Sequence, residues 1–282
     1  MMHRAARPPR TAVAPAAVLL AAALAAALSA PVRASPLASM DMRDDLLGWE
    51  AVGRVDTGTG GFCTGTLIAT DLVLTAAHCL YDPTRPGTLN DIAAYRFRAG
   101  FGNGAVIAER GVTRAFADPG FVHGAAGSAD SIRHDIALLH LDAPIPAATA
   151  SPFLVADLPA GQEGIAVVSY AAGREQALAI QRHCAVTGRG GGLFAFNCDV
   201  APGSSGAPVF DMSGGRGRIV SVISAGHVAA DGVVSYGMEL PALVEGVKRL
   251  MRSSRPAVAA AAPAILRPGE TRAGGARFVR AP

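Results

Sequence analysis

The stretch Pro202–Pro208, which reads PGSSGAP, follows Cys198 and leads into the apolar pair Val209–Phe210. Glycine, proline and serine are the residues that β-turns prefer, so the segment by itself predicts a tight turn. It also places two adjacent serine hydroxyls between two glycines. Glycine permits backbone conformations in which N–H groups converge on one point, so such a turn can present a serine together with hydrogen-bond donors. Two hypotheses follow, a plain turn and a turn that carries a nucleophile.

Two segments upstream carry a histidine and an aspartate. Leu74–Cys79 reads LTAAHC, and His78 within it follows a strand-like run among small residues. Asp135 stands at the head of the apolar run Ile136–Leu139, where an unpaired carboxylate would be costly to bury. Taken alone, His78 is interpreted as a structural histidine and Asp135 as an aspartate at a turn or strand edge.

The three segments together have a chemical meaning that each one lacks. Acyl transfer at neutral pH needs a nucleophile, a base that takes its proton and an acidic group that orients the base. Backbone N–H donors must also face the developing oxyanion. The chain order His78, Asp135, Ser205 is that of the chymotrypsin barrels, whereas α/β-hydrolases run Ser, Asp, His. Those hydrolases also need a glycine two residues after the serine, where this chain has Ala207.

The rest of the chain has the pattern of an all-β protein. From about Trp49, short β-prone runs alternate with Gly, Pro, Asp and Asn, which predicts a barrel or a sandwich. The Pro- and Ala-rich residues 142–161 are interpreted as a linker between two halves. Apolar residues at helical spacing predict a helix over residues 240–251, and the Ala-, Pro-, Gly- and Arg-rich residues beyond 252 predict disorder.

The N-terminal residues have the order of a secretory signal. Residues 1–10 are basic, residues 11–30 form an apolar run, and small residues follow. The small residues Val32 and Ala34 predict cleavage after Ala34, which leaves residues 35–47 as a flexible leader. A retained membrane anchor is the alternative, because the run is nearly long enough to span a bilayer, although its alanines make it weakly hydrophobic. We expect a secreted or periplasmic protein without a stable membrane anchor.

Composition and cysteine spacing exclude several classes. The chain has 282 residues and a formal net charge of only +3, which gives no reason to expect nucleic acid as a partner. Its four cysteines allow three pairings, of which the two short loops Cys63–Cys79 and Cys184–Cys198 are favoured in an oxidising compartment. Free buried thiols are the alternative, and a zinc site is disfavoured because CxxC and HExxH spacings are missing from the sequence. No cofactor and no metal are expected.

The segments LTAAHC, DIALL and GSSGAP resemble the three active-site blocks of the trypsin/chymotrypsin-like serine peptidases. The resemblance covers roughly residues 53–251, and the form SSGAPVF is similar to the bacterial branch that includes glutamyl endopeptidases. FCTGTLI resembles the family strand whose cysteine pairs with the cysteine after the histidine, which supports Cys63–Cys79. The fold that this resemblance implies is all-β, with two six-stranded antiparallel barrels and a C-terminal helix.

The resemblance also implies roles for individual residues. His78 would be the general base, Asp135 its orienting carboxylate and Ser205 the nucleophile, while Ser204 maintains the turn. The N–H groups of Gly203 and Ser205 would form the oxyanion hole. The implied activity is that of a monomeric, secreted serine endopeptidase acting on proteins or peptides. A catalytically inactive binding or regulatory protein on the same fold is the alternative.

The substrate pocket is inferred from the same resemblance. Asp199 stands where the family places the base of the primary pocket, with Ser224 and Gly226 on its wall, so a preference for Arg or Lys is expected. The alternative is that Asp199 points away from the pocket and accepts backbone hydrogen bonds. Glutamyl endopeptidases carry a histidine just before that wall, where this chain has Ile223. His227 is close in sequence, and a surface position is an equally good interpretation of it.

The chain departs from the animal enzymes before the nucleophile. Those enzymes have an aspartate there that pairs with a newly cut N-terminus, and this chain has Ser204 instead, which argues against activation by that ion pair. The expected boundaries are residues 1–34 for the signal, 35–52 for a leader or propeptide, 53–145 and 146–239 for the barrels, 240–252 for the helix and 253–282 for the tail.

Overall fold

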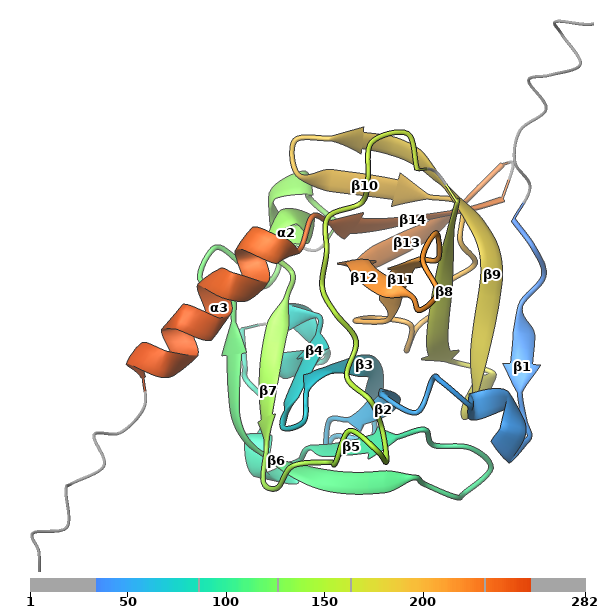
Figure 1. Ribbon diagram of the computed structural model, residues 1–282. Helices are drawn as coiled ribbons and strands as arrows, with labels where there is room; N and C mark the ends of the chain where they lie inside the picture. Colours follow the sequence, from blue (N-terminus) through green and yellow to red (C-terminus); the bar gives the residue numbers. More distant parts are fainter. Residues whose placement is uncertain (1–33, 86, 126, 163, 231, 255–282) are drawn as a thin grey trace, which may run out of the picture.

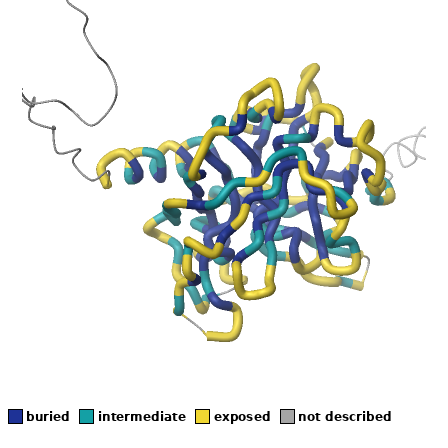
Figure 2. Tube along the Cα trace, turned by 90° about the horizontal axis from the view of Figure 1, so that it is seen from below, coloured by how far each residue is buried: buried dark blue, intermediate teal, exposed yellow. Residues whose placement is uncertain are grey.

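The computed structural model describes residues 34–85, 87–125, 127–162, 164–230 and 232–254 (Figure 1). Most of the expected signal, residues 1–33, and the expected disordered tail from residue 255 lie outside the described residues. Within the described ranges, no helix is both long enough and apolar enough to span a membrane. Figure 2 shows buried residues gathered in the middle of the molecule, with exposed residues in the surrounding loops.

The first half is a closed antiparallel barrel with the strand order β2-β3-β4-β7-β6-β5. Its strands are β2 (Val52–Asp56), β3 (Phe62–Ala69), β4 (Leu72–Thr75), β5 (Arg96–Ala99), β6 (Ala108–Ala117) and β7 (Ala137–Leu141). Successive side chains of a strand point to opposite faces, so one face of each strand lines the barrel interior. The interior holds large side chains with no solvent exposure, among them Leu67, Leu74 and Leu138.

The second half is an antiparallel sheet of eight strands along the path β12-β11-β8-β9-β10-β14-β13, with β1 paired to β9. Its strands are β1 (Ala38–Met40), β8 (Gly164–Ala171), β9 (Arg174–Gly190), β10 (Leu193–Phe196), β11 (Pro208–Asp211), β12 (Arg218–Val222), β13 (Ala225–Ala229) and β14 (Gly232–Met238). The expected all-β fold is confirmed. The second half differs in detail from a six-stranded barrel, because β1 joins it and its path ends at β12 and β13.

The segment expected to be a flexible leader is part of this sheet. Ala38–Met40 pairs in register with residues 178–180 of β9. Ser35 is held as well, because its N–H donates to the His183 carbonyl at 2.7 Å. The Ser35 carbonyl accepts from Nε2 of Gln181 at 2.6 Å. The expectation of flexibility was therefore wrong here, since the edge of β9 supplies hydrogen-bond partners that the local sequence does not reveal.

Four short helical elements complete the described fold: η1 (Arg43–Leu46), η2 (Ala77–Leu80), η3 (Ile92–Ala94) and α2 (Ala129–Arg133). The longer helix α3 (Pro241–Ser253) lies close to the predicted helix and begins with proline, which suits a first turn. It buries Val244, Val247 and Met251 and packs against β6 and β7 of the first barrel. Arg114 of β6 donates to the carbonyls of Met251 at 3.2 Å and Ser254 at 3.1 Å, so helix-end carbonyls find partners.

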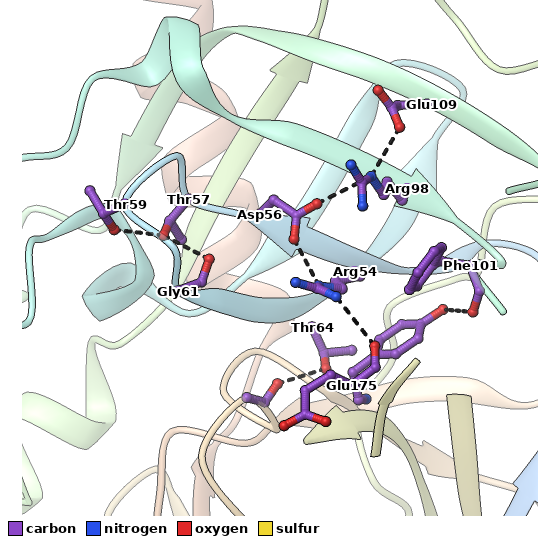
Figure 3. A network of polar contacts seen from close by, with 12 residues as sticks. Arg54, Asp56, Thr57, Thr59, Gly61, Thr64, Arg98, Phe101, Glu109 and Glu175 are labelled. Carbon is purple, nitrogen blue, oxygen red and sulfur yellow. Dashed lines mark hydrogen bonds and ion pairs between the residues drawn. The ribbon is translucent and has the colours of Figure 1, made fainter. Parts of the chain in front are cut away.

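A charged network joins the two halves (Figure 3). Arg54 of β2 donates to the Glu175 carbonyl of β9 at 3.3 Å and pairs with Asp56 at 2.7 Å. Asp56 in turn lies 3.2 Å from Arg98. The Arg54 guanidinium also lies over the Phe62 ring, 4.4 Å from its centroid. Arg54 therefore contacts both halves, and its charge is compensated by Asp56 of the same strand.

Both predicted disulfides are present. Cys63–Cys79 joins β3 to η2 with a Cα–Cα distance of 6.3 Å. Cys184–Cys198 joins β9 to the segment before the glycine turn, with a Cα–Cα distance of 5.2 Å. The expected pairing by short loops is confirmed. Each disulfide links a strand to a segment that lies outside the strands.

The double variant Cys63→Ala/Cys79→Ala is expected to lose roughly 3 kcal/mol of unfolding free energy, because the disulfide restricts the unfolded chain. Urea denaturation with matched m-values measures this loss. The matched variant Cys184→Ala/Cys198→Ala opens a loop of similar length, with sequence separation 14 against 16, and should lose a similar amount. Four free thiols in a peptide map made without reduction would contradict both bonds.

Candidate active site

His78 lies in η2, directly after β4. Ala76 and Ala77 before it are fully buried, and Cys79 after it is bonded to Cys63 of β3. The short helical turn and the disulfide together hold the backbone of His78 at the edge of the first barrel. The ring remains about one-third exposed, so it can meet a substrate.

The carboxylate of Asp135 is buried and accepts three hydrogen bonds. Asp135 is 2 % exposed and lies between α2 and β7. Its Oδ1 accepts from the backbone N–H of His78 at 2.8 Å, and its Oδ2 from the His78 Nδ1–H at 2.6 Å. Oδ2 also accepts from Oγ of Ser224 at 2.6 Å. Because a carboxylate only accepts, the proton of the neutral ring is on Nδ1 and Nε2 remains an acceptor.

The same contacts change the protonation of His78. Burial by itself lowers the pKa of His78, but the charge of Asp135 and its hydrogen bond raise it by more. The pKa of His78 therefore lies above its ordinary value. A raised folded-state pKa stabilises the fold at pH values below the ordinary pKa, and this contribution is lost as the pH rises through the folded-state pKa.

The glycine turn that precedes β11 packs against the first barrel. Gly203 and Gly206 have φ values of +96° and +75°, a region that favours glycine. A Cβ on Gly206 would collide with the backbone of Thr64 and Ala76. A Cβ on Gly203 would collide with the Phe62 ring. Both glycines are thus required by backbone conformation and by close approach to strands of the other half.

Hydrogen bonds of the turn leave two N–H groups unused. The Pro202 carbonyl accepts from Ala172 at 2.7 Å, and the Ser204 N–H donates to Ala201 at 2.9 Å. Among the described residues, the N–H groups of Gly203 and Ser205 donate no hydrogen bond. Two unpaired donors that flank a serine hydroxyl are the arrangement that an oxyanion hole requires.

Ser204 serves the turn and not the cleft. It is 1 % exposed, and its hydroxyl lies 3.3 Å from the Tyr170 carbonyl and 3.3 Å from the Ala201 nitrogen. Arg174 donates to the same hydroxyl at 3.4 Å. Of the two adjacent serines, Ser205 is the one with partial exposure.

Two cavities share part of their lining. One of about 360 Å³ is lined by His78 and Asp135, and one of about 540 Å³ is lined by Ser205. Ser224 and Ala225 line both cavities, so the cavity of His78 and Asp135 and the cavity of Ser205 adjoin at these two residues. In the described part of the chain no hydrogen bond joins Ser205 to His78. In free enzymes such contacts often form only with substrate.

The cavity beside Ser205 differs in its lining from the expected pocket. Its lining consists of Val200, Ala201, Pro202, Ser205, Ile223, Ser224, Ala225, Gly226, His227, Val228 and Val233. Asp199 is exposed and is not among these lining residues. The Asp199 N–H donates to Oε1 of the buried Gln181 at 2.7 Å, which helps to fix the backbone with Val200 facing the cavity.

The predicted wall residues Ser224 and Gly226 do line this cavity, and sequence reasoning missed two further contacts. The bond from Ser224 to Asp135 was not expected. His227, left open as a surface residue, also lines the cavity and stacks on Tyr236 with ring centroids 5.7 Å apart. The one signal for His227 in the sequence was its position directly after Gly226.

One cluster has the spacing of a metal site. The ligand atoms of Cys63, His78 and Cys79 lie within 4.8 Å of one another. Both sulfurs form a disulfide, so they provide no thiolate, and these residues do not fit a metal ion.

Comparisons with solved structures show what the fold is similar to. A Glu endopeptidase in complex with MPD matches with a TM-score of 0.64 and 18% identity, over 79% of this chain and 100% of that chain. Protease Anisep from Arthrobacter nicotinovorans matches with a TM-score of 0.57 and 19% identity, over 73% and 96%. The thermostable serine protease AL20 from an extremophilic microorganism matches with a TM-score of 0.58 and 19% identity, over 73% of this chain and 98% of that chain. At identities this low, the structural matches show a shared chymotrypsin-like fold and no more than that.

No curated protein gives a significant match to this chain. The family model for the trypsin-like peptidase domain matches residues 63–220. This range is more than half of the chain and holds His78, Asp135 and Ser205. The chain therefore belongs to the trypsin-like peptidase family.

Proposed function

We propose that this protein is a serine endopeptidase that uses Ser205, His78 and Asp135 as a catalytic triad. The observation that carries the proposal is the double contact of Asp135 with the backbone and ring of His78, in a cavity that shares Ser224 and Ala225 with the cavity of Ser205. Those hydrogen bonds orient the neutral imidazole, and they stabilise the imidazolium that forms once His78 has taken the proton.

The chemistry follows from the positions of the groups. Oγ of Ser205 attacks the carbonyl carbon of the scissile peptide while Nε2 of His78 takes its proton. The resulting oxyanion is stabilised by the N–H groups of Gly203 and Ser205. The C–N bond then breaks as His78 gives the proton to the leaving amine, and an acyl-enzyme remains. A water molecule, deprotonated by His78, hydrolyses the ester and restores Ser205.

The competing proposal is an inactive binding protein on the same fold. The unpaired N–H donors at Gly203 and Ser205 favour the enzyme, because a binding role gives no reason to leave two donors free beside a serine hydroxyl.

We also propose an exported protein, secreted or periplasmic, with cleavage after Ala34. The two disulfides and the neighbouring bacterial proteases support this location. The pairing of β1 with β9 supports retention of the segment after Ala34 in the mature enzyme.

The proposed substrate preference is for an uncharged or acidic side chain before the cut. The described lining beside Ser205 is mainly aliphatic, contains no carboxylate and has His227 as its one titratable side chain. A cationic side chain would be desolvated there without a partner, whereas a carboxylate could accept a hydrogen bond from His227. The Glu endopeptidase among the similar structures agrees with this polarity.

Ser205→Ala is expected to abolish peptide hydrolysis, and Asp135→Asn should reduce kcat by about 10⁴ through the wrong tautomer of His78. Steady-state kinetics on a cleaved peptide and fluorophosphonate labelling of Ser205 measure both effects. Asp130→Asn is the matched control, because Asp130 is 92% exposed and pairs with Arg133. Wild-type rates in Ser205→Ala would refute the proposal.

The pKa of His78 is expected to lie above its ordinary value of about 6.5. The acid limb of the kcat/KM profile should therefore lie above pH 6.5, with activity lost as the pH falls and His78 becomes protonated. NMR titration of His78 in Ser205→Ala gives the same pKa without turnover. In Ser205→Ala/Asp135→Asn the pKa should be lower, because burial remains and the charge is gone. A pKa that does not move on this change would contradict the proposed cause.

A peptide library is expected to show no preference for Arg or Lys before the cut. Asp199→Ser should leave the selected side chains unchanged, since Asp199 lies outside the cavity. His227→Ala should lower kcat/KM for acidic side chains by about tenfold relative to uncharged ones, as expected for loss of one hydrogen bond to a charged group. Selection of Arg or Lys that disappears in Asp199→Ser would restore the original pocket assignment.

A further inference from the structure

Thr64 of β3 contacts the glycine turn from the opposite half of the molecule. Its backbone N–H donates to the Ser205 carbonyl at 2.9 Å. Its hydroxyl donates to the Gly203 carbonyl at 2.9 Å and accepts from the Tyr170 N–H at 3.1 Å. Thr64 is completely buried, and it lies at the junction of the halves in Figure 3.

The hydroxyl of Thr64 both donates and accepts a hydrogen bond in these contacts. It has one proton, which goes to the Gly203 carbonyl, and it accepts the N–H of Tyr170. Tyr170 is fully buried and Gly203 is buried as well. Removal of the hydroxyl would leave a buried donor and a buried acceptor without partners, which is costlier than the loss of an exposed bond.

These contacts hold the peptide plane that lies between the two N–H donors of the turn. Glycine has no side chain to restrict rotation, so the peptide planes on either side of Gly203 must be held by other groups. The plane before it is held because the Pro202 carbonyl accepts from Ala172 at 2.7 Å. The plane after it is held by the hydroxyl of Thr64. That second plane links the plane carrying the Gly203 N–H to the plane carrying the Ser205 N–H, so the hydroxyl of Thr64 restricts how the two donors are oriented relative to each other.

We propose that the hydroxyl of Thr64 is a positioning group for the oxyanion hole, supplied by the first barrel to the turn of the second half. This inference rests on the proposed peptidase function and adds a residue to its machinery. Thr64 acts through Gly203 and does not touch the substrate. Its loss should therefore weaken stabilisation of the transition state and leave binding of the ground state unchanged.

The chain provides a matched control on the same strand. Thr66 lies two residues further along β3, faces the same side and is 1 % exposed. Its hydroxyl finds no hydrogen-bond partner among the described residues. Thr66→Val therefore removes a buried hydroxyl with the same change of shape as Thr64→Val, but it breaks no bond to the turn.

The experiment measures kcat and KM for a cleaved peptide, together with the rate at which a small dialkyl fluorophosphonate labels Ser205. Thr64→Val should lower kcat and the labelling rate by about 10- to 100-fold, below the 10²–10³ that loss of an oxyanion donor costs. KM should stay within about twofold. Thr64→Ser should remain close to wild type, and so should Thr66→Val. Thermal unfolding gives the folded fraction used to normalise each rate.

If Thr64→Val does not fold, the pair Thr64→Ser and Thr64→Ala gives the same comparison, since the two differ only by the hydroxyl. The inference is overturned if kcat does not fall on loss of the hydroxyl, if the change is in KM, or if Thr66→Val loses as much activity. Labelling of Ser205 in the wild type and in Thr66→Val keeps this outcome separate from the proposed function. An unlabelled wild type would refute the function itself.

Discussion

The contact between β3 and the glycine turn is the constraint around which the site is arranged. A turn of glycine, serine and proline has little conformational preference of its own, so its shape must come from partners. Thr64 binds the carbonyls of Gly203 and Ser205, and Gly206 lies so close to the backbone of Thr64 that no side chain fits. The closed first barrel keeps β3 rigid, and β8 and β11 carry the turn toward it. The two halves therefore have to dock accurately before the turn has a defined geometry.

The buried carboxylate of Asp135 shows the same dependence on both halves. A charge of this kind is tolerated only when its lone pairs are satisfied. His78 of the first barrel supplies two of the donors and Ser224, next to β13, supplies the third. The Arg54 network compensates charge where β2 meets β9. Electrostatic partners at the junction thus come in sets that are complete only in the docked state.

Much of the fold and of the candidate site could be predicted because the signals are local. The cysteine pairs close short loops, α3 follows the 3.6-residue period, and the histidine, aspartate and serine stand in a characteristic order. The strand within the expected leader was missed because Ala38–Met40 becomes a strand only by pairing with β9. The exposed position of Asp199 could not be foreseen for a similar reason. Its backbone is held by Gln181, a residue distant in sequence, and a shift of one residue reverses which side chain faces a cavity.

The sequence by itself determined the fold family, the disulfide pairing and the identity of the candidate triad, since each is encoded by residue type and spacing along short segments. Only the tertiary structure decided which side chains line the cavity and which groups hold the turn. The bond from Thr64 to Gly203 joins residues 139 positions apart, and neither residue signals it locally. A hydroxyl takes whichever donor and acceptor the packed strands bring within reach. Its partners are therefore a property of the docked halves and not of the strand that carries it.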